Sequence, residues 1–469
     1  MRIARRAGLA LLIAFCLSKT VLAQREQGYI PPVPFTDAQT SPLAQTVLQP
    51  AVNLGQALLA AGILPRLRYV DAAATNPIGG LSRGLDNSGV VMFGADLDLD
   101  RIAGLRGGIL HAGFAQLYGR ELSTDNIGSR TKVQSFYYPN KQFELTELTY
   151  EQALLDGRIN LLVGRANATG EFARSTYGCR FQNVADCPFE LTQVVAGFPG
   201  FPYVNWGGRV RLRPTPDTYI KSGAYEVNPA RIRNSGLDWG IERSSGYVVP
   251  VEVGFETTFL TDRHPRHYKL GGWYNSAPYT DPLLNTRGRS RAQFNGSPLG
   301  YSGGRRGIYA LGDQIVWRHD DVSLRGVTLF GGVAAPFDAT ELFTMQALGG
   351  LLWTGPFDAR PADTIELLGS YIQLSQREAQ FLNQLLAKAG ARSFIARSGY
   401  VFEANYGVRV IPGVLLQAGL QYLVNPDDIL RPRTKFAPRD ALVVGLKLVI
   451  NANEILGLPD QLPALYRGG

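Results

Sequence analysis

The sequence predicts an all-β fold, a transmembrane antiparallel β-barrel of about sixteen strands. Two observations predict it. Between positions 64 and 450, stretches of about ten residues alternate in polarity, and the connections between them are alternately short and long. In the run 400–411, Phe402 and Tyr406 share one parity while Glu403 and Asn405 share the other. A period of two places these sets on opposite faces of a strand, one suited to lipid and one to water.

The first 23 residues are predicted to be a secretory signal peptide. An apolar run at 9–17 follows Arg2, Arg5 and Arg6, and the residues before position 24 suit cleavage after Ala23. An uncleaved anchor is the alternative, but the apolar run is short for a membrane span. Removing this segment takes away four basic residues and no acidic one, so the formal charge falls from +8 to +4.

Residues 24–63 are predicted to form an amino-terminal periplasmic or plug segment. Within it, 52–61 has the pattern of a short apolar helix bounded by Pro50 and Gly62. The helix would either plug the barrel or lie at its periplasmic mouth. A linker without fixed structure is the alternative.

The barrel is predicted over residues 64–451, followed by a carboxy-terminal periplasmic tail at 452–469. The strands are expected to begin near Leu64, Gly89, Gly108, Phe143, Arg158, Asn205, Thr218, Val249, His267, Gly307, Arg325, Met345, Asp363, Gly399, Val414 and Ala441. An even strand number places both termini in the periplasm, so the odd-numbered connections are extracellular loops. The long loops are 119–142, 166–204, 228–248, 277–306, 375–398 and 424–440.

Two of these loops carry further signals. Residues 377–389 have apolar side chains at helical spacing, which predicts a helix on the extracellular rim. Cys179 and Cys187 lie together in the longest loop, and the oxidising periplasm favours a disulfide between them. Two free surface thiols are the alternative. A metal site would lack nearby histidine ligands, so neither a metal nor another cofactor is predicted.

Charged residues on one parity of several strands identify the face toward the lumen. Arg209, Arg211 and Arg213 alternate with apolar residues, and guanidinium groups near the middle of a bilayer are costly. Trp273 offers an aromatic face to the C–H groups of a sugar. The candidate pore-lining, substrate-binding residues are Asp96, Asp98, Arg209, Arg211, Arg213, Glu252, Glu256, Lys269, Trp273 and Asn275. Alternatively, the charges only solvate the wall and pair across strands, and Trp273 faces an inserted loop.

Three further residues are candidates near the outer strand ends. Arg165 and Arg174, at the start of the longest loop, are candidates for a constriction. Trp206 is a candidate for an aromatic residue at the membrane interface.

Several motifs, in order and spacing, resemble the OprB-type carbohydrate-selective porins over nearly all of 62–450. They include Asn76-Pro77-Ile78-Gly79-Gly80, Asp96-Leu97-Asp98-Leu99-Asp100, Gly157-Arg158-Ile159-Asn160-Leu161, Gly271-Gly272-Trp273-Tyr274 and Tyr422-Leu423-Val424-Asn425-Pro426. The resemblance implies a sixteen-stranded barrel that passes sugars across the bacterial outer membrane by diffusion. The sequence departs from the family in the cysteine pair, in Asp427-Asp428, and in lacking a terminal aromatic residue that closes the last strand.

An enzyme is the main alternative class, because some outer-membrane barrels are hydrolases that pair a nucleophile with a base. The chain has four histidines. His264, His267 and His319 fall near expected periplasmic turns, and His111 lies in a strand without an evident serine and acidic partner on its parity. A non-enzymatic protein is therefore predicted.

Two transport classes also compete. A gated, energy-dependent transporter normally carries a folded plug domain, for which 24–63 is too short. A general, non-specific ion and small-solute porin shares the fold and stays open as the alternative to a carbohydrate porin. The expected partners are outer-membrane lipid, the sugar substrate and the outer-membrane assembly machinery; nucleic acid is excluded and a homo-oligomer is left open.

Overall fold

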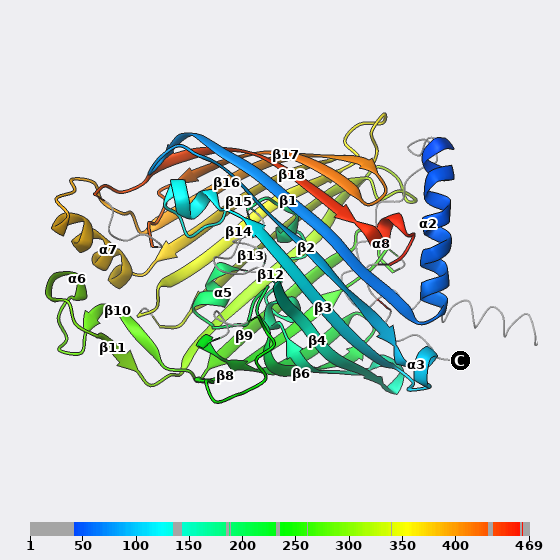
Figure 1. Ribbon diagram of the computed structural model, residues 1–469, viewed down its shortest axis with the longest axis horizontal. Helices are drawn as coiled ribbons and strands as arrows, with labels where there is room; N and C mark the ends of the chain where they lie inside the picture. Colours follow the sequence, from blue (N-terminus) through cyan, green and yellow to red (C-terminus); the bar gives the residue numbers. More distant parts are fainter. Residues whose placement is uncertain are drawn as a thin grey trace, which may run out of the picture.

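The structure, a computed structural model, describes residues 42–134, 143–183, 187, 189–230, 235–259, 261–338, 340–429, 435–459 and 462. The predicted signal peptide lies outside the described residues. Within them, sixteen strands form one closed antiparallel barrel (Figure 1). The strands are β1 Ile63–Gly80, β2 Leu85–Asp98, β3 Gly108–Gly119, β4 Phe143–Leu154, β5 Ile159–Ala166, β6 Asn205–Thr215, β7 Thr218–Val227, β8 Gly246–Glu256, β9 Arg266–Asn275, β12 Arg305–Arg318, β13 Gly326–Pro336, β14 Phe343–Thr354, β15 Thr364–Leu374, β16 Ser398–Ile411, β17 Val414–Val424 and β18 Arg439–Asn451. The predicted fold class is confirmed.

The alternation of polarity sets the two faces of the wall. On β16, Glu403 and Asn405 are buried on the inside, whereas Phe402 is exposed on the outside. The turn to β17 is tight. Gly413 there has a φ of +77°, and a Cβ atom would lie 2.4 Å from the carbonyl oxygen of Asn451, so this turn requires glycine.

The first and last strands close the barrel. β1 pairs antiparallel with β18 from Arg68 opposite Asn451 to Gly80 opposite Arg439. All other neighbours in the barrel follow the chain order. No strand edge of the barrel is therefore left unpaired among the described residues, which removes the exposed edge of an open sheet.

The long connections gather at one end of the barrel (Figure 1). The rim there carries the small sheet of β10 (Tyr279–Asn285) and β11 (Pro298–Tyr301) with α6 (Arg291–Phe294) and α7 (Gln376–Lys388). The π-helical turn η2 (Ser123–Ile127) lies at the same end. The opposite end carries α2 (Pro42–Ala60), α3 (Leu99–Ala103) and α8 (Ala452–Ile455). This segregation matches the predicted topology.

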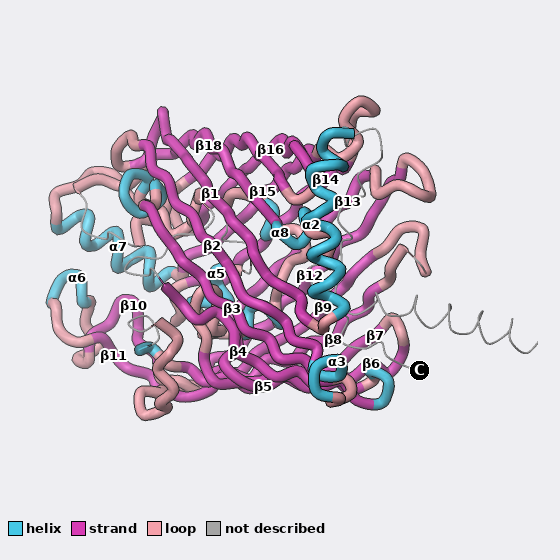
Figure 2. The backbone as a smooth tube through the Cα atoms, turned by 45° about the vertical axis from the view of Figure 1, so that its right-hand side comes forward, coloured by secondary structure: helices cyan, strands magenta, loops and turns pink. Residues whose placement is uncertain are grey.

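Helix α2 is longer than the helix predicted at 52–61 and lies outside the wall, across the periplasmic end (Figure 2). Gln56 Nε2 donates to the carbonyl of Gly457 at 3.1 Å, next to α8. Arg101 Nη1 donates to the carbonyl of Leu59 at 2.8 Å, at the last turn of α2. Among the described residues, no helix has the length and apolarity to cross a bilayer.

Helix α7 confirms the predicted helix of the extracellular rim. Its N-cap is Ser375, whose Oγ accepts from the backbone N–H of Glu378 at 3.1 Å. Leu382 and Leu386 are buried with Ile395 in the main hydrophobic cluster. The helix is thus anchored at its first turn and along one face.

Glu378 makes this rim sensitive to pH. Burial raises the pKa of its carboxyl to about 7, with Arg291 opposing and Asp427 adding to the shift. Since this pKa lies above that of the unfolded chain, about 4.3, the folded rim holds the proton more tightly. The stabilisation is full below the unfolded pKa and is lost as pH rises through about 7. We expect larger hydrogen-exchange protection factors in 376–388 at pH 5 than at pH 8.

The matched control is Glu378→Gln, which keeps the shape but cannot ionise. In this variant the protection factors should no longer depend on pH. Equal protection of the wild-type helix at both pH values would contradict the prediction.

Candidate functional site in the pore interior

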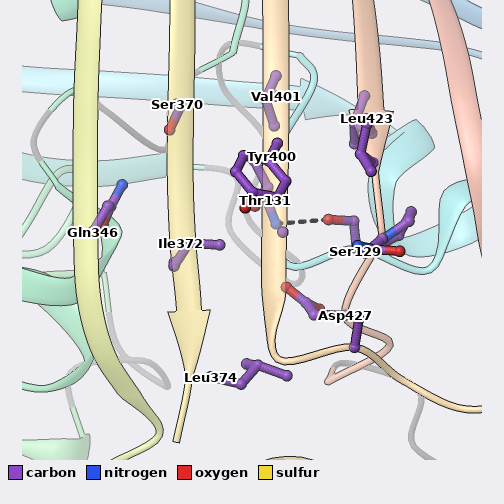
Figure 3. A pocket seen from close by; sticks show the side chains of 15 residues that line it. Ser129, Thr131, Gln346, Ser370, Ile372, Leu374, Tyr400, Val401, Leu423 and Asp427 are labelled. Atoms are coloured by element: carbon purple, nitrogen blue, oxygen red, sulfur yellow. Dashed lines mark hydrogen bonds between the residues drawn. The ribbon is translucent and has the colours of Figure 1, made fainter.

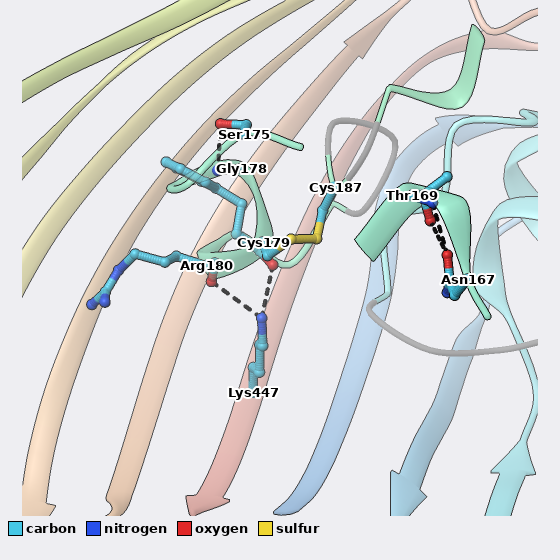
Figure 4. The surroundings of a disulfide bond; sticks show 9 residues. Asn167, Thr169, Ser175, Gly178, Cys179, Arg180, Cys187 and Lys447 are labelled. Carbon is cyan, nitrogen blue, oxygen red and sulfur yellow. Dashed lines mark hydrogen bonds between the residues drawn. A yellow bond between two sulfur atoms is a disulfide. The ribbon is translucent and has the colours of Figure 1, made fainter. Parts of the chain in front are cut away.

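The described residues between β5 and β6, which are 166–183, 187 and 189–204, fold back inside the barrel, and we call them the inner segment. It contains α4 (Ala168–Glu171), the 3₁₀ turn η4 (Gly178–Arg180) and α5 (Glu190–Val194). Figure 4 shows η4 and the Cys179–Cys187 disulfide lying beside the barrel strands. The predicted disulfide is confirmed. This loop therefore occupies the lumen instead of extending outward.

Aromatic side chains join the inner segment to the wall. The rings of Phe198 and Trp273 lie edge to face at 6.4 Å, and Trp273 stacks on Tyr309 at 6.5 Å. Phe181 packs against Phe330 at 5.8 Å. All belong to one buried cluster inside the barrel. Trp273 is only 4% exposed, so it faces an inserted loop, the alternative that the sequence left open.

Wall side chains bind the backbone of the inner segment. The Glu403 carboxylate accepts from the backbone N–H groups of Gln182 and Asn183 at 2.7 and 3.0 Å. Lys447 Nζ donates to the carbonyl of Arg180 at 3.1 Å (Figure 4). A buried irregular segment has no ladder of its own, so its peptide groups need such partners.

Glu252 fixes a second point of the inner segment. Its carboxylate accepts from the hydroxyls of Tyr219 and Tyr309 at 2.6 and 2.8 Å and from the backbone N–H of Ala173 at 3.2 Å. Ala173 has a φ of +54°, a conformation unfavourable for alanine. The hydrogen bond thus holds the backbone in the position that orients the next residue, Arg174.

Arg174 is exposed although Ala173 and Ser175 on either side are buried. Its side chain forms no hydrogen bond or ion pair with a described residue, while its carbonyl accepts from Lys269 Nζ at 3.2 Å. An exposed side chain on a segment inside the barrel faces the water of the lumen. Arg174 therefore brings a positive charge to the lumen, within electrostatic range of Glu171.

A row of ionic side chains runs along the inner wall of β1–β6. Arg209 Nε pairs with Glu171 of the inner segment at 2.8 Å, and Arg209 Nη2 lies 3.3 Å from Glu151. His111 lies between Glu151 and Asp96, at 2.9 and 2.7 Å. Since these charges are buried and paired, they mainly fix the wall and the inner segment.

The structure places most predicted pore residues inside the barrel. Arg213 pairs with Glu256, and Asn275 Nδ2 donates to the carbonyl of Ala196 in the inner segment at 2.9 Å. The buried members on the inner side are Asp96, Arg209, Arg211, Glu252, Glu256, Trp273 and Asn275. Arg213 and Lys269 are partly exposed.

Asp98 has a structural role that the sequence did not predict. Its side chain accepts from the backbone N–H groups of Asp100 and Arg101 and caps α3 at the periplasmic end. At a strand end, the short polar side chain satisfies the free donors of the next helix.

Sequence reasoning missed several residues. His111 was treated as lacking acidic partners, yet Asp96 and Glu151 come from the neighbouring strands β2 and β4. Glu403 served only as an example of the alternation, and Lys447 was not named. One signal was available: residues 166–204 contain many aromatic residues for a solvated loop, and Phe172, Phe181, Phe189 and Phe198 are buried in the structure.

A small crevice lies where Ser129 and Thr131, in the connection from β3 to β4, meet β14–β17 (Figure 3). Ser129, Thr131, Gln346, Ser370 and Asp427 contribute its polar lining. The Thr131 backbone N–H donates to Ser129 Oγ at 3.1 Å. Because these groups come from both the loop and the wall, the crevice marks the contact between the loop and the wall. In the described part of the chain, no group of three or more His, Cys, Asp or Glu residues is arranged to hold a metal ion.

Comparisons with known proteins agree with this geometry. Residues 82–451 match the family model of the carbohydrate-selective porin, OprB family. The chain belongs to the OprB family. "Porin B" of Pseudomonas aeruginosa is 26% identical over 410 residues, 83% of this chain and 88% of that protein. The high pH structure of Pseudomonas putida OprB has a TM-score of 0.76 at 26% identity and covers 84% of this chain and 96% of that one.

OprB membership establishes a carbohydrate-selective porin of the outer membrane. Porins are channels, so membership of this family indicates that the protein acts as a channel. The motifs that carried the resemblance in the sequence lie in the strands and turns of the barrel wall. The inner segment is then the element that narrows the channel of this OprB-family protein.

The disulfide should limit the motion of the inner segment of this OprB-family porin. It joins two cysteines that are eight positions apart. Without it, the unfolded segment would gain conformational entropy that favours unfolding by roughly 2–3 kcal/mol. For the double variant Cys179→Ser with Cys187→Ser we expect larger fluctuations of single-channel current, because the segment samples more positions. A reducing agent should have the same effect on the wild type and none on the variant. Unchanged current noise in both tests would contradict this role.

Proposed function

We propose that mono- and small oligosaccharides cross the outer membrane by passive diffusion through this channel, between the inner segment and the barrel wall. The observation that supports it best is the exposed guanidinium of Arg174 inside the lumen, held by a backbone that Glu252 positions. Guanidinium N–H groups are donors for sugar hydroxyls, and they need no net charge on the solute. Arg174 and the half-buried Lys269 are the proposed contacts.

In this proposal the buried residues act indirectly. Arg209, Arg211, Glu252, Glu256 and Trp273 fix the inner segment rather than touch the solute, because they are covered. No catalytic step is part of the proposal.

The test is single-channel recording in a planar bilayer with and without glucose or maltose. We expect each sugar to lower the ion current at saturating concentration and to be recovered chemically unchanged after passage into liposomes. A current that no sugar alters would favour the general ion porin, which shares the fold but has no sugar-binding constriction. Release of a modified sugar would contradict a channel without catalysis.

A further inference from the structure

Two side chains of the outer strand ends are buried although they point away from the lumen. Leu145 on β4 and Arg165 on β5 have the outward parity of Phe143 and Val163, which are 41% and 59% exposed. Leu145 is 1% exposed and Arg165 is 3% exposed. Another part of the chain must cover them. Residues 235–241 do so, and we call this segment the rim flap.

The rim flap is seated on the wall by its backbone. The Leu145 N–H donates to the carbonyl of Ser235 at 2.8 Å, and Arg165 Nη2 donates to the carbonyl of Gly236 at 3.3 Å. Gly236 has a φ of +78°, and a Cβ atom there would lie 2.7 Å from the carbonyl oxygen of Leu145. Glycine thus allows the flap to approach the strand end closely.

The flap also shields a charge on the outward parity. Arg165 lies 3.9 Å from Glu226, and its guanidinium is 5.5 and 5.8 Å from the ring centres of Trp206 and Trp239. A guanidinium at this position would otherwise border lipid, where an uncovered charge is costly. The flap carbonyl of Gly236 and the indole of Trp239 provide the cover.

The flap exposes three large apolar side chains. Leu237, Trp239 and Ile241 are 48%, 46% and 64% exposed, and the charged Asp238 and Glu242 beside them are exposed as well. Trp239 packs on Trp206 at 5.6 Å, and Trp206 Nε1 donates to the Trp239 carbonyl at 2.9 Å. Trp206 is the first of the outward, exposed aromatic residues at the extracellular ends of β6, β8 and β9: Trp206, Tyr247 and Tyr274. Through Trp239, the apolar side chains of the flap are therefore continuous with the lipid-facing wall.

We propose that the rim flap is a membrane anchor whose Leu237, Trp239 and Ile241 side chains insert among the acyl chains of the outer leaflet. Continuity with the lipid-facing wall favours lipid as the occupant. A second copy of the chain is disfavoured, because three half-exposed side chains offer on the order of 300 Å², well below the roughly 800 Å² per partner of a stable interface. The anchor would keep the ends of β4–β6 closed around Arg165.

Spin labels test the anchor directly in vesicles of dioleoylphosphatidylcholine. Cysteine variants for labelling are Ile241→Cys in the flap, Leu270→Cys on the outward face of β9 and Phe294→Cys on α6 of the extracellular rim. All three native side chains are more than half exposed, at 64%, 57% and 52%, and the native disulfide is left intact. Oxygen collides with labels in lipid, and a water-soluble nickel chelate collides with labels in water.

We expect the label at 241 to behave like the label at 270, with oxygen favoured over nickel, and the label at 294 to show the reverse. A label at 241 that prefers nickel, as at 294, would overturn the anchor, because the flap would then lie in water. A label at 241 that neither reagent reaches would also overturn it and would favour contact with a second copy. Leu237→Cys provides a second flap position if the label at 241 disturbs the segment.

Discussion

Trp273→Ala should destabilise the packing inside the barrel by about 3–5 kcal/mol, the usual cost of deleting a buried indole. The side chain lies between Phe198 of the inner segment and Tyr309 of the wall, so its loss leaves a cavity between the inner segment and the wall. We expect a lower melting temperature and a larger, noisier single-channel conductance, because the inner segment loses an anchoring contact.

Trp317→Ala is the matched control. Trp317 on β12 is 47% exposed, so its removal takes away an indole without opening the interior. This variant should conduct like the wild type. If Trp273→Ala kept both the wild-type conductance and the wild-type stability, the packing role would be wrong. A selective loss of sugar binding at unchanged stability would instead favour direct stacking of sugar on the indole.

Reversing the charge of Arg174 should have the largest effect on selectivity. Arg174→Glu changes the lumen by two unit charges, and one such charge within a few ångströms of a passing ion is worth on the order of 1 kcal/mol in water. We therefore expect the anion-to-cation permeability ratio to fall by roughly fivefold or more, measured as the reversal potential under a salt gradient. Sugar block should weaken as well, because a carboxylate accepts hydrogen bonds and offers no donors.

Two further variants serve as controls. Arg174→Lys changes the shape of the side chain but keeps its charge, and Arg243→Glu makes the same charge reversal at another position. Lysine keeps the positive charge, so the reversal potential should stay near that of the wild type. Arg243 is exposed on the extracellular loop before β8, so the same charge reversal there should change the reversal potential little in physiological salt. A wild-type reversal potential in Arg174→Glu would show that this guanidinium does not face the conducting path.

The wall of this porin could be predicted from the sequence, because alternation is a local property of each strand. β4, β7 and β17 begin at the predicted residues Phe143, Thr218 and Val414. The inward face of Arg209 and the outward face of Phe402 also follow from parity alone.

What stands opposite an inward residue could not be predicted, because parity says nothing about the far side of the lumen. Trp273 is covered by Phe198, which arrives from a different part of the chain. His111 meets carboxylates from two neighbouring strands, and the interstrand register decides that contact. The sequence analysis missed β10 and β11, because strands of seven and four residues are too short to show a clear alternation. Strand parity also gave no sign that Asp98 caps the short helix that follows β2.

The pairing of β1 with β18 has a consequence for the order in which the barrel assembles. β1 emerges early during synthesis and has to wait, with one edge unpaired, until β18 is complete, and an unpaired edge invites aggregation. Escort by chaperones would have to last for that whole interval. In the finished protein, separating these two strands would also break the contact of α2 with the residues after α8. Pairing of β1 with β18 thus removes the last open edge of the sheet, and with it the tendency of that edge to aggregate.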